Sequence, residues 1–202
     1  MSNPKLVDVT PFEPLIIKTH YDGWKYNDVL KKSEEMIKDT SAGSFLEEGN
    51  AKSSAGSKVQ PHMTKEFSEF YYWIKPICQH IVYKEWNFLK SYDFGIVNSW
   101  VNYHDEDGIT AEHNHGTAIM VITAYLNLPE DGGFIEFKDP MEYPKGFFPK
   151  ENNTYREYDW KPIKAKTGDV LMFPGWLRHR VQPNKSKERR WVLTTNLNYT
   201  KQ

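Results

Sequence analysis

The feature that most constrains the fold is a change in hydrophobic spacing near residue 90. Before it, apolar residues recur at helical 3.6-residue spacing in two segments, residues 26–37 and 64–89. After it come short runs rich in β-branched and aromatic residues, bounded by Gly, Pro and Asp: residues 94–103, 118–128, 134–139, 169–175 and 190–199. Helices followed by short strands indicate an α+β protein whose strands roll into a jelly roll or barrel supported by the helices.

Two residues of the second helical segment need separate interpretation. Pro76 removes a backbone donor, so we expect the helix to kink or split near Lys75. Cys78 is the one cysteine of the chain, which excludes an intrachain disulfide. Its apolar neighbours predict that it packs in the core.

Composition limits the class of protein. The 202 residues, 39% of them hydrophobic, predict one compact domain over residues 1–202, with helical support mainly from 20–90 and a barrel mainly from 94–200. Lys+Arg 26 against Asp+Glu 27 gives a net charge of -1, so nucleic-acid or membrane partners are not expected, and a small molecule or peptide fits better. With neither a signal-peptide pattern nor a membrane-spanning run in the sequence, we expect a soluble cytoplasmic protein.

Two segments depart from the average composition. Residues 41–60 are rich in Gly, Ser and Ala and are typical of a loop. Residues 139–162 combine Pro, Gly and Asn with many aromatic residues, which indicates an ordered insertion or lid. Its aromatic residues either cover a reactive site or pack against the barrel wall: Tyr143, Phe147, Phe148, Tyr155, Tyr158 and Trp160. Trp176 has the same two interpretations, as a pocket residue or a packing residue.

Three histidines are candidate metal ligands. His113 and His115 are two residues apart, so both rings share one face if they begin a strand. His179 follows the strand-like run 168–174, which ends in a Pro-Gly turn. Three ligands with open positions suit a catalytic transition metal better than a closed structural site. The competing interpretation is that these rings are exposed or bonded to backbone groups.

The remaining histidines have no ligand-like spacing, and we expect them to be surface or packing residues: His20, His62, His80 and His104.

Four segments carry a family resemblance through their order and spacing. They are Asn102-Tyr103 followed by Gly108 and His113, Tyr125-Leu126-Asn127 followed by Gly132-Gly133 and 134–137, Gly168–Phe173 leading to His179–Pro183, and Arg190–Thr194. Together they resemble the Fe(II)/2-oxoglutarate-dependent dioxygenase superfamily, close to its prolyl-hydroxylase-like group with small, partly viral members.

The resemblance implies a double-stranded β-helix, a cofactor and a reaction. Fe(II) would be bound by His113, His115 and His179, and 2-oxoglutarate by Arg190, whose guanidinium can grip a carboxylate with two hydrogen bonds. Tyr125 would donate its hydroxyl to 2-oxoglutarate, or else be a buried structural tyrosine. The implied activity is hydroxylation of an unactivated C–H bond of a peptide or amino acid, with release of succinate and CO2.

One position departs from the family. Where the family has Asp or Glu two residues after the first histidine, this chain has His115. Three neutral imidazoles would leave iron its full +2 charge and raise its reduction potential. Either His115 ligates the metal, or water or another oxygen takes its place, or Asp139 or Glu136 swings in. Glu112 is disfavoured because strand alternation turns it away.

Two rival functions stay open. A cupin-like three-histidine iron dioxygenase would not use 2-oxoglutarate, so Arg190→Ala should leave its activity nearly intact. A non-catalytic jelly-roll binding protein or viral structural protein with a decayed site would hold no iron.

Three weaker features receive structural interpretations. Gly132-Gly133 is predicted to be a hairpin turn, and Asp139-Pro140 a strand end. Residues 185–190 form a basic run that we expect to be a solvated turn, with Arg189 on the face opposite Arg190.

Overall fold

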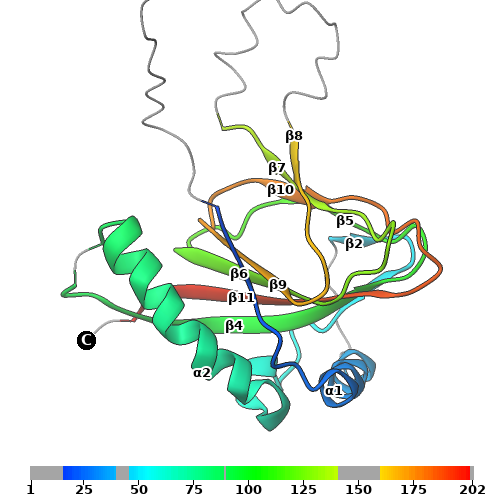
Figure 1. Cartoon of the computed structure of the whole chain (residues 1–202), viewed down its shortest axis with the longest axis horizontal. Coiled ribbons are helices and arrows are strands. Elements are labelled where there is room, and N and C mark those ends of the chain that lie inside the picture. The colour runs from blue at the N-terminus through cyan, green and yellow to red at the C-terminus, as the bar shows by residue number, and fades with distance from the viewer. Residues whose placement is uncertain (1–15, 40–45, 89, 141–159, 201–202) are drawn as a thin grey trace, which may run out of the picture.

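Two antiparallel sheets lie face to face in the computed structural model, which describes residues 16–39, 46–88, 90–140 and 160–200 (Figure 1). The six-stranded sheet has the order β1-β9-β6-β11-β4-β3, and the five-stranded sheet β2-β5-β10-β7-β8. The strands are β1 (Ile17–His20), β2 (Glu47–Glu48), β3 (Ala51–Ser53), β4 (Asp93–His104), β5 (Ile109–His113), β6 (Met120–Asn127), β7 (Ile135–Lys138), β8 (Trp160–Ile163), β9 (Asp169–Phe173), β10 (His179–Val181) and β11 (Arg190–Thr200).

The helices α1 (Tyr26–Lys38) and α2 (Lys65–His80) cover the outer face of the six-stranded sheet (Figure 1). Phe70 and Ile74 of α2 pack in one apolar cluster with Val101 of β4 and Leu193 of β11. A short 3-10 turn, η1 (Pro61–Met63), precedes α2. This arrangement confirms the predicted α+β double-stranded β-helix with supporting helices.

Side-chain alternation divides each long strand between two cores. Trp191 and Leu193 face the helices, whereas Val192 belongs to the cluster inside the barrel. Leu171 and Phe173 of β9 belong to that inner cluster too, together with Phe137 of the opposite sheet. Every second residue of β4 and β11 therefore enters the space between the sheets. A polar side chain there is costly unless it has a hydrogen-bond partner or binds a ligand.

The helix predictions are confirmed except at Pro76. Helix α2 runs through Pro76 without a split near Lys75 and continues into a π-helical turn, η2 (Ile81–Glu85). Pro76 lies on the exposed side of α2, while Ile74 and Cys78 are buried, so packing holds the helix and the lost hydrogen bond faces water. Cys78 packs in the core as expected. No helix in the described ranges is both long and apolar enough to cross a membrane.

All five strands predicted from residue patterns are present, as β4, β6, β7, β9 and β11, whereas the sequence analysis did not predict β1, β2, β3, β5, β8 and β10. The segment 41–60, predicted to be a loop, contains β2 and β3, which pair with β5 and β4. Strand β1 pairs with β9, so the N-terminal part of the chain contributes strands as well as helices. Two- to four-residue strands are too short to show alternation. Strand β7 ends at Lys138, before Asp139-Pro140, as predicted.

The Gly132-Gly133 pair is not a hairpin turn. It joins β6 of one sheet to β7 of the other, after a turn in which the Gly132 N–H donates to the Pro129 carbonyl at 2.9 Å. Gly133 has φ +73°, and a Cβ there would lie 2.6 Å from the Pro183 carbonyl oxygen. Only glycine lets these backbones approach so closely.

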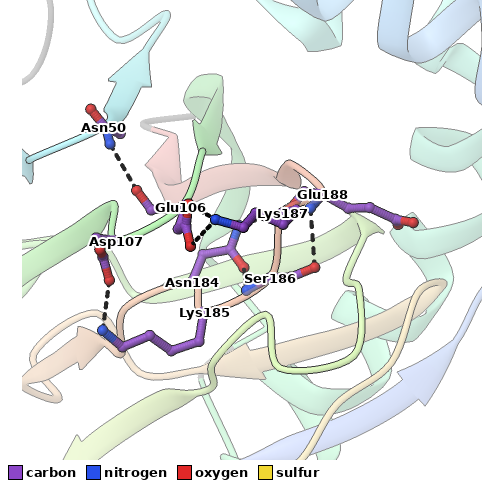
Figure 2. Close-up of polar contacts among 8 residues, drawn as sticks. All are labelled: Asn50, Glu106, Asp107, Asn184, Lys185, Ser186, Lys187 and Glu188. Atoms are coloured by element: carbon purple, nitrogen blue, oxygen red, sulfur yellow. Dashed lines mark hydrogen bonds and ion pairs between the residues drawn. The ribbon is translucent and has the colours of Figure 1, made fainter.

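The basic run before β11 is an exposed turn, as predicted, and its lysines also form surface ion pairs. The Lys185 Nζ lies 2.6 Å from Asp107 Oδ1, and the Lys187 Nζ lies 2.6 Å from Glu106 Oε2 (Figure 2). Arg189 was expected to be a solvated charge. Instead its Nε and Nη2 donate to the two carboxylate oxygens of Asp105 at 2.7 and 2.9 Å.

Asn184 fixes this turn against the end of β4. Its buried Nδ2 donates to the carbonyl oxygens of His104 at 2.9 Å and Glu188 at 2.8 Å. The Asp107 N–H donates to the Asn184 carbonyl at 2.7 Å. These bonds set the position at which β11 begins, and hence the position of Arg190.

The close approach at Gly133 gives a stability prediction. Gly133→Ala should lower the free energy of unfolding by roughly 3 kcal/mol, because it adds a backbone clash to left-handed strain. Gly116→Ala is the matched control: Gly116 has φ +57° but open space around a built Cβ, so only about 1 kcal/mol should be lost. Urea unfolding measures both, and equal losses would contradict the assigned clash.

Candidate metal centre

The three candidate histidines come together at the end of the barrel formed by β5 and β10. His113 is the last residue of β5 and His179 the first of β10, and their Cα atoms are partners in the antiparallel register. His115 lies beyond β5, where its N–H donates to the Gly175 carbonyl at 2.8 Å. The sequence analysis expected His113 and His115 to begin a strand. Instead, His113 ends β5 and His115 follows it. One ligand atom from each ring lies within 4.8 Å of the other two.

Backbone carbonyls fix the tautomers of two of the rings. The His113 Nδ1 is 2.8 Å from the Ala111 oxygen, and the His179 Nδ1 is 2.9 Å from the Leu177 oxygen. A carbonyl oxygen only accepts, so each Nδ1 carries the hydrogen and each Nε2 presents a lone pair. This is the usual support for a metal-binding imidazole.

Burial keeps the three rings neutral. It lowers the pKa of His113, lowers that of His115 to about 4, and lowers that of His179 well below its ordinary value. Repulsion between the protonated rings acts in the same direction for His115 and His179. At neutral pH the cluster therefore offers lone pairs and no positive charge, which is what a divalent cation requires.

The nearby carboxylates are engaged elsewhere. Glu136 accepts from Arg180 Nε at 2.7 Å and from Gln182 Nε2 at 2.9 Å, on the face of β7 opposite the rings. Glu112 forms an ion pair with Arg178, so it does point away as expected. Among the described residues, which include Asp139, no carboxylate joins the histidine cluster.

A cavity of about 440 Å³ opens onto the three rings from between the sheets. Inward-facing residues of the long strands line it: Asn98, Trp100, Asn102 and His104 from β4, Thr123 and Tyr125 from β6, and Val192, Thr194 and Asn196 from β11. The Trp100 ring stacks on the His115 ring, with centroids 5.8 Å apart and planes 22° apart. The trio thus faces a partly open space lined by both polar and apolar side chains.

Arg190 is fully buried and does not itself line this cavity, but its Cα partner His104 and the nearby Tyr125 do. Its Nη1 donates to the carbonyl oxygens of Gly132 and Gln182, the latter at 3.2 Å. Its Nε and Nη2 have no hydrogen-bond partner in the part of the chain that the structure describes. Burial lowers the pKa of Arg190 to about 10, so it remains charged at neutral pH. A buried cation with two free donors is costly unless an anion binds there.

Tyr125 lies inside the barrel close to Arg190. Burial raises the pKa of its hydroxyl, and the Arg190 charge opposes that shift. The hydroxyl is therefore a neutral donor over the whole physiological range. The structure thus brings together all five residues singled out from the sequence.

His104 was missed by the sequence reasoning, which treated it as a surface or packing residue. It is buried, lines the cavity, and is the Cα partner of Arg190. Burial and the Arg190 charge lower its pKa well below the ordinary value. Its position two residues after Asn102 on the same strand face was the available signal, but that signal has meaning only once the β4–β11 register is known.

Other predicted positions fall outside the site. Trp176 is 52% exposed, so it is neither a core residue nor a residue lining this cavity. Trp160 lies on β8, where the Arg180 guanidinium sits 4.2 Å from its ring centroid. The other aromatic residues of the predicted lid lie outside the described residues.

Comparisons with known proteins agree with this geometry. Residues 98–196 match the family described as putative 2OG-Fe(II) oxygenase. No curated protein matches the chain significantly.

Three solved structures illustrate the likeness. The epimerase SnoN from nogalamycin biosynthesis is 10% identical, with a TM-score of 0.61 over 92% of this chain and 76% of that one. HygX from Streptomyces hygroscopicus, solved with nickel and 2-oxoglutarate, is 11% identical, with a TM-score of 0.60 over 93% and 84%. A prolyl-4-hydroxylase from Pseudomonas putida is 12% identical, with a TM-score of 0.57 over 92% and 93%.

The depressed histidine pKa values predict acid sensitivity of the metal-free protein. The unfolded chain takes up protons near pH 6.5 and the buried rings do not, so stability is complete above pH 6.5 and falls below it. For each ring that stays neutral, the free energy of unfolding should fall by about 2 kcal/mol between pH 7.5 and pH 5.0. His104→Asn should reduce this fall in the free energy of unfolding by the contribution of one ring. Urea unfolding at the two pH values measures it. An unchanged fall in the variant would contradict the shift assigned to His104.

Proposed function

The chain belongs, through residues 98–196, to the 2OG-Fe(II) oxygenase family, and from this premise we propose that it hydroxylates an unactivated C–H bond. The proposed reaction consumes O2 and 2-oxoglutarate and releases succinate and CO2, with a peptide or amino acid as substrate. The structural likeness to a prolyl-4-hydroxylase supports that substrate class. The observation that carries the proposal is a buried guanidinium with a free edge, whose neighbours His104 and Tyr125 line a cavity that opens onto three neutral imidazoles.

In this proposal His113, His115 and His179 hold Fe(II) through their Nε2 atoms. The carbonyl bonds to the Nδ1 atoms of His113 and His179 orient those two rings, and Trp100 packs against the His115 ring. Bound Fe(II) supplies O2 activation coupled to decarboxylation of the 2-oxo acid. Burial among the surrounding residues keeps the rings neutral. HygX, of the same fold, was solved with nickel and 2-oxoglutarate.

Arg190 would hold the distal carboxylate of 2-oxoglutarate. The Nε and Nη2 hydrogens lie on one edge of the guanidinium and point in parallel, which matches the two oxygens of a carboxylate. Nη1, on the other edge, is held by the Gly132 and Gln182 carbonyls and cannot swing away. Tyr125 would add a neutral hydroxyl donor to the same anion.

The free edge of Arg190 also favours this function over its rivals. A cupin-like dioxygenase that does not use a diacid would leave a buried cation with two unmet donors, at a cost of several kcal/mol. A binding protein with a decayed site would have no reason to retain it. The donors are explained when a dicarboxylate is a ligand.

Formation of the chelate tests the proposal directly. Anaerobic protein loaded with Fe(II) should give a visible charge-transfer band when 2-oxoglutarate is added. Arg190→Ala should weaken 2-oxoglutarate binding about 100-fold, since it removes a bidentate charged pair. Far-UV circular dichroism and Fe(II) binding serve as controls for folding of the variant. The absence of a band with the wild type, or equal half-saturation in the folded variant, would contradict the function.

A second test addresses the unusual third ligand. His115→Ala should lower Ni(II) affinity by roughly 100-fold, because one of three ligands is lost. Glu136→Gln is the matched control and should leave affinity unchanged, since Glu136 bonds Arg180 and Gln182 on the outer face. Titration with a competing chelator measures both. Full affinity in His115→Ala would exclude His115 as a ligand, and loss in Glu136→Gln would point to the carboxylate alternative.

A further inference from the structure

His104 and Arg190 face the same side of two paired strands. Their Cα atoms are direct partners in the β4–β11 register, and directly paired residues project to the same face of a sheet. His104 lines the cavity, and only 1% of its surface is exposed. The imidazole therefore lies close enough to the Arg190 guanidinium for the positive charge of Arg190 to lower its pKa.

One ring nitrogen of His104 has no hydrogen-bond partner among the described residues. Its Nε2 lies 2.8 Å from Thr110 Oγ1, whereas its Nδ1 is buried without a hydrogen-bond partner among the described residues. Buried polar atoms are nearly always bonded, and each exception calls for an explanation. Three buried nitrogens without partners belong to these two paired residues: Nδ1 of His104 and Nε and Nη2 of Arg190.

The three nitrogens suit one kind of ligand. Both guanidinium nitrogens can only donate, so their common ligand must accept hydrogen bonds. His104 donates from Nδ1 when Thr110 donates its hydroxyl hydrogen to Nε2, and the Thr110 contact permits that tautomer. A carboxylate has enough lone pairs to accept from all three nitrogens.

We propose that His104 binds the distal carboxylate of the 2-oxo diacid, donating from Nδ1 to the same anion that the Nε and Nη2 of Arg190 grip. Thr110 is a positioning residue that selects the required tautomer. This inference rests on the proposed function. It adds a binding residue, and it makes recognition of the distal carboxylate depend on a neutral donor as well as a cation.

Two substitutions separate this role from a structural one. The amide nitrogen of Asn can take the place of Nδ1, whereas the amide of Gln reaches the place of Nε2. His104→Asn therefore retains the donor to the ligand, and His104→Gln retains the bond to Thr110. The probes are 2-oxoglutarate and 2-oxobutyrate, which has the same chelating end but no distal carboxylate.

Calorimetric titration of the Ni(II)-loaded protein gives the expected pattern. His104→Gln should lose about tenfold in affinity for 2-oxoglutarate and nothing for 2-oxobutyrate. His104→Asn should stay within about threefold of the wild type for both. An unchanged 2-oxoglutarate affinity in His104→Gln, or an equal loss for both probes, would overturn the role of His104. A wild type that does not prefer 2-oxoglutarate to 2-oxobutyrate would overturn the proposed function itself.

The tautomer provides an independent readout. In Zn(II)-loaded protein labelled with 15N, saturation with 2-oxoglutarate should place the His104 hydrogen on Nδ1, and Thr110→Val should lower that population. An Nδ1 that stays unprotonated with the ligand bound would overturn the proposal, whatever the affinities.

Discussion

Pairing of β4 with β11 determines which side chains enter the barrel. The register places Arg190 opposite His104, Val192 opposite Asn102 and Asn196 opposite Asn98. Because side chains alternate between faces, the residues between them, such as Leu193 and Val101, build the core under the helices. One set of backbone hydrogen bonds thus supports both the apolar layer that stabilises the fold and the polar wall of the cavity. A slip of one residue would exchange the two and destroy both.

Two short strands of the second sheet position two of the three proposed metal ligands, His113 and His179. Strands β5 and β10 have few backbone bonds of their own, yet their register brings His113 to His179. The same alternation that turns His179 inward turns its neighbour Arg180 outward to Glu136. On this sheet the outward ion pairs and the inward histidines are two results of one strand geometry. The carboxylates nearest in sequence to the rings are therefore unable to serve the metal without breaking the sheet's outer contacts.

The sequence was informative where chemistry and local spacing coincide. The His113–His115 interval and the later His179 predicted a cluster that the structure contains, because the family resemblance supplied the long-range register that spacing alone lacks. His104 and Arg189 were missed, because the role of each depends on a partner distant in the chain: Arg190 for one, Asp105 for the other. The split expected near Pro76 is absent, because Pro76 lies on the side of the helix that faces water.

The two glycines of the β6–β7 connection show the same dependence on tertiary structure. Read locally they suggested a hairpin, yet Gly132 offers its carbonyl to the Arg190 guanidinium and Gly133 permits the approach of the Gln182–Pro183 backbone. Together these glycines hold one edge of the Arg190 guanidinium, which could otherwise rotate.

Three neutral imidazoles would leave the full charge of a bound metal uncancelled, and this charge constrains which ligands and substrates the cavity can bind. A carboxylate ligand would cancel one unit of metal charge, and none is available among the described residues near the trio. A dianion bound between the metal and Arg190 would leave a net positive centre, so electrostatics strengthens diacid binding and weighs against a cationic substrate. The carboxylate of Glu47 on the cavity wall would balance that remaining charge, and the carboxamides of Asn98 and Asn196 add polarity without charge. The wall is therefore better matched to a neutral, hydrogen-bonding substrate group than to a lysine-like or arginine-like one.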